Sequence, residues 1–195
     1  MSKVILDMTM SLDGYIARPD GDDGGLHHWV FGGSYALEAG GITFHLTSEN
    51  SKQVFAGFVE EVGAFVIGRK SLVAGSEAPF FQLPTFVLTH TNRQSDDPLV
   101  TFITDGIESA LQKAKAAANG KAVYIGGGAD VAQQYLRAGL VDELHINLVP
   151  MIFGEGLRLL DNLTERLIHL HRLDVVEGES VTHIKYRINS TGQRV

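Results

Sequence analysis

Short apolar segments alternate with segments of helical periodicity along most of the chain, and this alternation restricts the fold more than any other feature of the sequence. The apolar runs predict strands at 4–10, 64–67, 85–89, 99–103, 122–125 and 143–149. Helices are predicted at 51–62, from Asp105 as the N-cap to about residue 118, and at 129–138. Two late segments, 171–176 and 180–188, predict an antiparallel hairpin. The expected fold is therefore α/β, with a mostly parallel central sheet covered by helices on both faces and an antiparallel hairpin at its end.

The composition is that of a globular protein, with 44% hydrophobic and 20% charged residues, and we expect one domain over residues 1–195. The absence of cysteine excludes a disulfide framework, a cysteine zinc site and a cysteine nucleophile. A net charge of −7 argues against a nucleic-acid partner, which requires a basic face. No run approaches the roughly 18 apolar residues of a membrane span, and the N-terminal apolar run meets Asp7 too early for a signal peptide. We therefore expect a cytoplasmic protein that acts on a small molecule.

Three glycines follow one predicted strand directly and precede a predicted helix, in the segment from Ile125 through Gly126, Gly127 and Gly128 to Ala129 and Asp130. Without Cβ atoms the backbone can approach a ligand closely, and the free amides at the helix start favour a phosphate. Val131 occupies the last position of a G-x-G-x-x-G pattern, so a Rossmann fingerprint is not supported. The alternative interpretation is a tight strand-to-helix turn without a ligand.

Two other predicted strands end in polar and cationic residues. One is followed by Gly68, Arg69, Lys70 and Ser71, and the other leads into Thr89, His90 and Arg93. Arginine and lysine suit phosphate groups, and open α/β sheets bind ligands at the carboxyl ends of their strands. These segments predict a compact anionic ligand across the sheet, although each alone is also typical of a solvated turn.

Asp7 and Asp13 are the candidate catalytic residues. Asp7 stands inside an apolar strand, where a carboxylate is costly unless it is paired or protonated. It is either a substrate-facing group or proton source, or a structural carboxylate bonded to loop amides. Asp13 precedes Gly14 and is either a turn former or a site residue. No metal site is predicted, because His169 and His171 have no carboxylate beside them in the sequence.

Several motifs in this order resemble the dihydrofolate reductase-like fold, and most closely the reductase (RibD C-terminal) domain of bacterial riboflavin-biosynthesis deaminase/reductases. Ser11-Leu12-Asp13-Gly14-Tyr15-Ile16-Ala17 resembles the S-L-D-G-x-I-A signature of that domain. Ile67-Gly68-Arg69-Lys70-Ser71 looks more like the G-R-x-[TS] loop of dihydrofolate reductase, and the glycine turn is common to both. Leu140 to Leu144, Pro150 and Gly154-Glu155-Gly156 are similar to the stretch that ends the reductase domain.

The resemblance implies NADPH as the cofactor. The glycine turn would face the pyrophosphate and nicotinamide, residues 69–71 would bind the pyrophosphate and the 2′-phosphate, and a cis peptide is expected at Gly126–Gly127. In chain order, the implied cofactor-binding residues are Thr9, Ile16, Ala17, Gly68, Arg69, Lys70, Ser71, Thr89, His90, Arg93, Ile125, Gly126, Gly127, Gly128, Ala129 and Asp130.

The activity implied is hydride transfer to a small heterocyclic substrate, similar to that of 5-amino-6-(5-phosphoribosylamino)uracil reductase. Two alternatives remain, a dihydrofolate reductase and a non-catalytic nucleotide-binding protein that keeps the fold. Dihydrofolate reductases place a carboxylate on the helix that corresponds to 51–62, whereas the acids here are Glu60 and Glu61, at its far end. We also expect a homodimer formed through the closing strands and the apolar loop at 150–153, because the alternating segment 181–188 should lie near a sheet edge.

Overall fold

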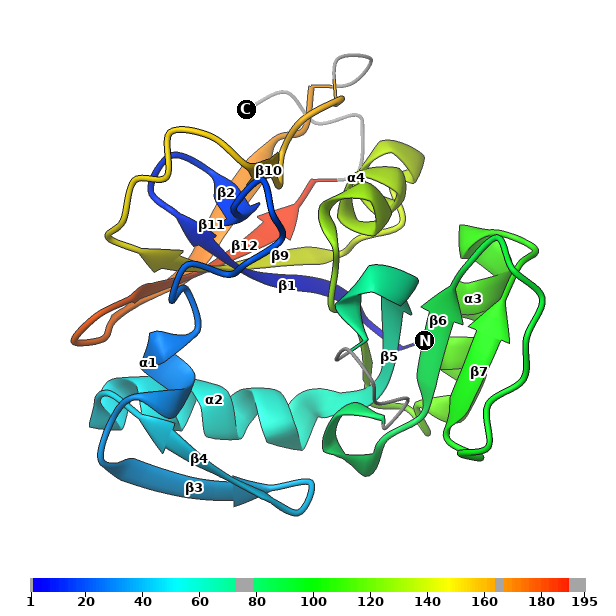
Figure 1. The fold of residues 1–195 in the computed structure, drawn as a ribbon, viewed down its shortest axis with the longest axis horizontal. Helices are drawn as coiled ribbons and strands as arrows, with labels where there is room; N and C mark the ends of the chain where they lie inside the picture. Colours follow the sequence, from blue (N-terminus) through cyan, green and yellow to red (C-terminus); the bar gives the residue numbers. More distant parts are fainter. Residues whose placement is uncertain (1, 73–78, 164–166, 190–195) are drawn as a thin grey trace.

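A computed structural model of the chain describes residues 2–72, 79–163 and 167–189, and an eight-stranded sheet forms its centre (Figure 1). From one edge to the other, the strands are β11 (Leu170–Glu177), β12 (Thr182–Ile188), β9 (Glu143–Val149), β1 (Val4–Ser11), β8 (Ala122–Ile125), β5 (Val62–Gly68), β6 (Thr85–Leu88) and β7 (Val100–Ile103). Strands β9 through β7 in this order run parallel, and β12 and β11 are antiparallel to their neighbours. The predicted α/β class, with a mostly parallel sheet and an antiparallel C-terminal hairpin, is confirmed.

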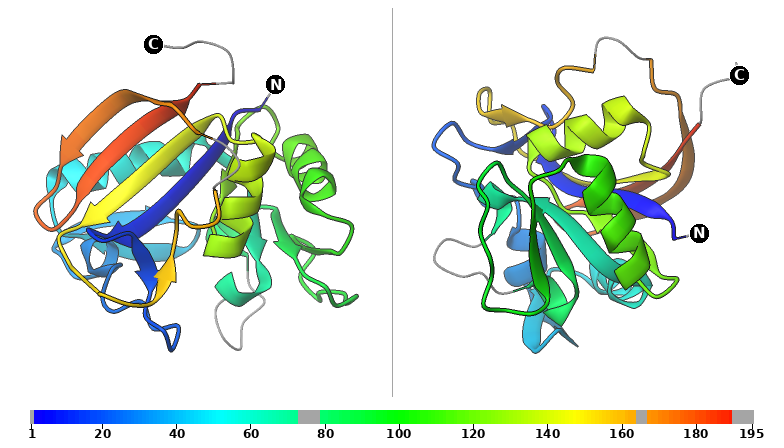
Figure 2. Two further views of the ribbon diagram at one scale, coloured as in Figure 1. Left: turned by 90° about the horizontal axis from the view of Figure 1, so that it is seen from above. Right: turned by 90° about the vertical axis from the view of Figure 1, so that its right-hand side faces the viewer.

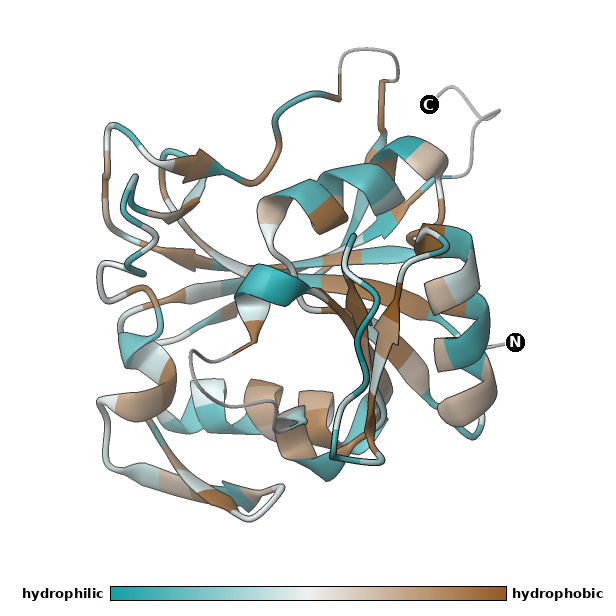
Figure 3. Ribbon diagram, turned by 45° about the vertical axis from the view of Figure 1, so that its right-hand side comes forward, coloured by the Kyte–Doolittle hydropathy of each residue, from teal (hydrophilic) through white to brown (hydrophobic). Residues whose placement is uncertain are grey.

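Helices cover both faces of this sheet (Figure 2). Helix α2 (Glu49–Glu61) lies on one face, and α3 (Ile107–Ala117) and α4 (Ala129–Ala138) lie on the other. Side chains alternate along β1, so that Leu6 packs into the cluster with α3 and α4 while Ile5 packs on the α2 side. Apolar colouring is concentrated in the central strands (Figure 3). Asp7 therefore points toward the α2 face, as Ile5 does.

Smaller elements surround this framework. They are α1 (His28–Phe31), the hairpin of β3 (Tyr35–Ala39) and β4 (Ile42–Leu46), the pair of β2 (Tyr15–Ala17) and β10 (Leu157–Arg158), and the 3₁₀ turns η1 (Arg69–Ser71) and η2 (Phe80–Gln82). In Figure 1 the hairpin lies below α2, and α1 lies above the left end of α2. None of the helices in the described ranges is long and apolar enough to cross a membrane.

The predicted N-cap of α3 is wrong. The residue before the helix is Gly106, with φ 102° and ψ 175°, a backbone conformation that favours glycine, and it offers no side-chain cap. Asp105 stands one position too early, and its carboxylate instead accepts a hydrogen bond from Ser109 Oγ at 2.8 Å. Acidic residues are common N-caps, and Asp105 therefore indicated a helix start one residue before Gly106, the actual N-cap.

Candidate active site

The glycine turn joins the centre of the sheet to α4. Strand β8 lies between β1 and β5 and ends at the fully buried Ile125. The amide of Gly126 still donates to Val66 O at 3.0 Å, and the carbonyl of Gly127 accepts from Gly68 N at 2.7 Å. The turn is thus bound to the end of β5, and it delivers the chain to α4, whose first amides have no side-chain cap.

Two of the three glycines of the turn, Gly126 and Gly127, are placed where a larger residue would meet protein or strain. A Cβ on Gly126 would lie 3.2 Å from Ile67 Cγ2, and Gly127 has φ +88°, a left-handed conformation. At Gly128 a Cβ would meet nothing closer than Ser71 Oγ at 3.8 Å. The predicted cis peptide at Gly126–Gly127 is wrong by one residue, because Gly126 still continues the strand and the cis bond joins Gly127 to Gly128.

Turn η1 lies beside the glycine turn, because a Cβ added to Gly128 would lie 3.8 Å from Ser71 Oγ. Its Arg69 and Lys70 side chains are exposed, and η1 has hydrophilic colouring in Figure 3. The second cationic segment follows β6, one strand further from the glycine turn. Its Thr89 amide donates to Ile103 O, His90 is exposed, and the Arg93 guanidinium lies 4.7 Å from the ring centroid of Phe102.

Asp13 holds the loop after β9 against the β1–β2 turn. Its carboxylate accepts hydrogen bonds from Ser11 Oγ at 2.6 Å and from the amides of Phe153 and Gly154. These bonds, above all the one from Ser11, lower the pKa of Asp13 to about 2. These hydrogen bonds are of the kind that the structural interpretation of Asp13 expects, and its catalytic role stays a prediction. The neighbouring Ile16 and Ala17 are half-buried in β2.

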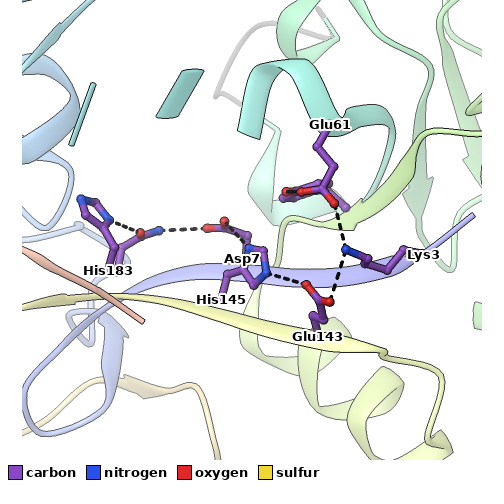
Figure 4. Close-up of polar contacts among 8 residues, drawn as sticks. Lys3, Asp7, Glu61, Glu143, His145 and His183 are labelled. Atoms are coloured by element: carbon purple, nitrogen blue, oxygen red, sulfur yellow. Dashed lines mark hydrogen bonds and ion pairs between the residues drawn. The ribbon is translucent and has the colours of Figure 1, made fainter. Parts of the chain in front are cut away.

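A row of polar side chains crosses the α2 face of the sheet through Asp7 (Figure 4). Asn147 Nδ2 on β9 donates to Asp7 Oδ1 at 2.9 Å, and Asn147 Oδ1 lies 2.7 Å from His183 Nδ1 on β12. His183 Nε2 in turn lies 3.0 Å from Ser51 Oγ at the start of α2. The buried Thr9 lies near this end of the row, where Trp29 Nε1 is 3.4 Å from Thr9 Oγ1.

The row continues from Asp7 in the other direction. His145 Nδ1 lies 3.7 Å from Asp7 Oδ2, and His145 Nε2 lies 3.1 Å from Glu143 Oε2. Lys3 bridges Glu143 and Glu61 at 3.2 and 3.1 Å. Burial alone would raise the pKa of Glu143, but the hydrogen bonds and charges of His145 and Lys3 outweigh it and lower this pKa.

Asp7 is more exposed than the two side chains that follow it in the row, His145 and Glu143. Its side chain is 25% exposed, against 6% for His145 and 12% for Glu143. Leu6 and Ile125 are the last pair in the parallel register of β1 and β8, and Asp7 and Gly126 directly follow them along the chain. The structure thus brings the candidate catalytic Asp7 next to the glycine turn.

Comparison with known proteins shows the family to which the chain belongs. The sequence model of the RibD C-terminal domain matches residues 2–177. The chain belongs to the RibD C-terminal domain family. It is 25% identical over 166 residues to the uncharacterized protein YwjB of Bacillus subtilis (strain 168), over 83% of this chain and 84% of YwjB.

Two solved structures show the same fold as this RibD C-terminal domain. A putative riboflavin biosynthesis protein from Shewanella sp. PV-4 has a TM-score of 0.70 and 23% identity, over 97% of this chain and all of that one. The dihydrofolate reductase of Enterococcus faecalis, complexed with NADP(H), has a TM-score of 0.63 and 16% identity, over 96% of this chain and 97% of the reductase. The dihydrofolate reductase-like fold expected from the sequence is therefore confirmed.

Three residues of the candidate site in this RibD C-terminal domain were not predicted from the sequence. They are His145, Asn147 and His183. They come from strands that meet Asp7 only in the folded sheet, so no spacing in the sequence joins them. One signal was present, because Glu143, His145 and Asn147 alternate with apolar residues along a predicted strand. No group of three or more metal-ligating side chains occurs among the residues that the structure places.

Proposed function

We propose that this protein is an NADPH-dependent reductase that transfers hydride to a small heterocyclic substrate, similar to 5-amino-6-(5-phosphoribosylamino)uracil reductase. One observation carries the proposal, namely that a glycine turn bound to the end of β5 lies beside both the cationic turn η1 and the accessible carboxylate of Asp7. Nucleotide-binding groups and a polar group for a second ligand thus lie side by side. This is the arrangement that hydride transfer between two bound molecules requires.

The residues around the turn fit a nicotinamide dinucleotide. The amides at the uncapped start of α4 and the backbone at Gly128, open but for the hydroxyl of Ser71, would hold phosphate groups. Arg69 and Lys70 are exposed beside them and would bind the 2′-phosphate. Thr9 and Ile16 would contact the nicotinamide, and Thr89, His90 and Arg93 the adenosine end. The cofactor supplies the hydride, and the protein supplies binding and orientation.

Replacing both Arg69 and Lys70 with alanine tests this assignment. Because each cation would make a charge-assisted bond to the 2′-phosphate, the double variant should bind NADPH about ten- to a hundredfold more weakly and NADH nearly as before. Fluorescence titration or calorimetry with both cofactors measures the difference. Lys113→Ala/Lys115→Ala, which removes the same charge from α3, is the control. Equal losses for the two cofactors in the η1 variant would place the 2′-phosphate elsewhere.

The positions of Glu60 and Glu61 at the end of α2 give the dihydrofolate reductase alternative less support than the proposed function has. Glu61 accepts hydrogen bonds from Lys3 and from Tyr124, and Glu60 is exposed. Dihydrofolate-dependent oxidation of NADPH would restore that alternative. NADPH binding without turnover of any member of a pyrimidine and pterin panel would instead favour a non-catalytic nucleotide-binding protein.

A further inference from the structure

The ring of Phe81, from the turn η2, lies in a group of aromatic rings on the α2 face of the sheet. It stacks on Phe44 from β4 and on Phe65 from β5, with ring centroids 5.4 and 5.9 Å away and interplanar angles of 15° and 18°. From α2, Phe58 meets it edge-on at 5.3 Å. Phe44 and Phe65 are each 5% exposed, whereas Phe81 is half-buried. Phe81 is therefore the more exposed ring in both stacked pairs.

The backbone that carries this ring is strained. Phe81 has φ 54° and ψ 21°, and the next residue, Gln82, also has φ 54°. The left-handed region is uncommon for residues other than glycine, and it is costly for a bulky side chain. Such strain persists where the surroundings enforce it, and it is concentrated at binding sites and switch regions. The segment can therefore release free energy by leaving this conformation, provided that the contacts of its ring are replaced.

The turn of the β3–β4 hairpin holds η2 in this conformation. A Cβ on Gly40 would lie 2.4 Å from Phe81 Cα, so Gly40 packs directly on the backbone of η2. A Cβ on the next glycine, Gly41, would instead lie 3.2 Å from Gln82 Nε2, the far end of a flexible side chain. The two glycines of one turn thus differ, because Gly40 borders the η2 backbone and Gly41 borders a side chain that can move.

The space that the Phe81 ring fills against Phe44, Phe58 and Phe65, here called the aromatic slot, lies beside the glycine turn. A Cβ on Gly126 would lie 3.9 Å from Phe65 Cδ1. Aromatic rings attract one another in stacked and edge-on arrangements at separations of roughly 4.5–7 Å, which the rings around Phe81 satisfy. A planar heteroaromatic ring in the place of the Phe81 ring would keep these contacts and would lie against the expected nicotinamide site.

We propose that the Phe81 ring closes the aromatic slot, and that a planar, uncharged heteroaromatic substrate displaces it on binding. The ligand is uncharged because the side chains that line the slot are hydrocarbon. The inference rests on the proposed function, since a ring in the slot is reduced only if a hydride donor binds at the glycine turn. A ligand shifts such an equilibrium only by the difference in its affinity for the two states. The strain of η2 lowers the free energy that this displacement requires.

The first test follows Phe81 itself. The probe is lumazine, a planar bicyclic heteroaromatic compound, added to the full chain labelled with 4-fluorophenylalanine. In fluorine NMR, the Phe81 resonance is assigned by its absence from Phe81→Leu. Saturating lumazine should move this resonance to the position of a solvent-exposed ring, whereas Phe86, buried on the opposite face of the sheet, should not respond. No binding of lumazine, or binding that leaves the Phe81 resonance unchanged, overturns the inference.

The second test uses the two glycines of the hairpin turn. Gly40→Ala places a methyl group against the Phe81 backbone and favours the displaced state, so lumazine should bind about tenfold more tightly. Gly41→Ala is the matched control, because its φ of 78° is left-handed like the 57° of Gly40, and it should bind lumazine like the wild type. The fluorescence of lumazine measures both affinities. Equal affinities of the two folded variants contradict the inference.

A third variant decides the matter if Gly40→Ala does not fold. Phe81→Ala removes the closing ring and should also bind lumazine more tightly than the wild type. Weaker binding by this variant would show that Phe81 is a wall of the binding site that stacks on the ligand, and it would overturn the inference. Circular dichroism establishes that each variant is folded.

Binding of NADP⁺ is measured separately on the same proteins. A protein that binds NADP⁺ but whose Phe81 resonance does not respond to lumazine contradicts the inference about the slot and leaves the proposed function in place. A protein whose Phe81 ring is displaced by lumazine but which binds no nicotinamide nucleotide contradicts the proposed function instead.

Discussion

His183 is 2% exposed between Ser51 and Asn147, and its burial has a consequence for stability in mild acid. Burial lowers its pKa to about 4, with Asp7 opposing this shift and Lys185 adding to it. The unfolded chain takes up the proton near pH 6.5, so the stabilisation from neutral His183 is complete above that pH and is lost as the pH falls toward 4. We expect a loss of about 3 kcal/mol of unfolding free energy over this window.

Replacing His183 with glutamine should remove this part of the pH dependence. The glutamine carries no titrating proton, although it lowers the stability at pH 7 because the hydrogen bonds of the row are disturbed. Urea unfolding at pH 7, 5.5 and 4.5 measures the difference. His45→Gln, at an exposed position on β4, is the matched control. A His183→Gln protein with the same acid sensitivity as the wild type would contradict the assignment.

At the same scale, the sequence could identify Asp7 but not its partners. A single carboxylate inside an apolar strand can be recognised from the sequence alone, and its burial is costly unless another group forms a hydrogen bond or ion pair with it. The partner proved to be the Asn147 side chain from a strand 140 positions later. Asp13 differs from Asp7. Its motif resembles a family signature that implies a site residue, whereas its carboxylate accepts hydrogen bonds from backbone amides.

Among the elements, the unit of β8, glycine turn and α4 depends most on one residue type. Gly127 has φ +88°, and a Cβ there would lie 2.9 Å from Met8 Cε. Gly127→Ala should lower the unfolding free energy by about 1–2 kcal/mol through this strain, and it should weaken NADPH binding. Gly57→Ala, in the middle of α2 with open space around it, should instead stabilise the protein by about 0.5–1 kcal/mol. Urea unfolding of both variants checks this, and equal effects of the two would contradict it.

Elements with a strong pattern were predicted with accurate bounds, and elements without one were missed. Helix α4 and strands β8 and β9 have the bounds read from the sequence, because Gly139, Gly126 and Pro150 directly follow them. The hairpin of β3 and β4 was missed although Gly40-Gly41 joins its strands, with φ of 57° and 78°. Both strands carry many exposed residues, so their hydrophobic signal is weak, and the two-glycine turn was the cue that remained.

At the scale of the whole molecule, the two faces of the sheet differ in how their apolar and polar side chains are arranged. The face under α3 and α4 is one continuous apolar cluster that includes Leu6, Val66 and Ile125. The face under α2 holds two separate apolar clusters, one around Trp29 and the other around Tyr124. The polar row lies on this second face. Because an uninterrupted core on one face supplies much of the apolar burial, the other face can carry buried polar groups.

The same architecture leaves one sheet edge open, and we propose that a second copy of the chain covers it. Among the residues that the structure describes, strand β11 pairs only with β12, and its Leu173 and Val175 side chains are 37% and 47% exposed. Ile152, in the loop after β9, is 74% exposed, whereas Phe153 is half-buried and packs against Arg18. An exposed edge with apolar side chains is usually paired or covered, and twofold symmetry is the commonest way to do so.

Light scattering at micromolar concentration should therefore give twice the 21.2 kDa mass of one chain. Leu173→Lys/Val175→Lys should produce folded monomers, because like charges then meet across the edge and both side chains are already exposed in the single chain. Ile152→Ser tests the loop without disturbing the packing of Phe153. Gln112→Lys, on the exposed side of α3, adds charge away from this edge and should leave the dimer intact. A wild-type protein with the mass of one chain would refute the dimer, and lysine variants that remain dimeric would move the interface away from β11.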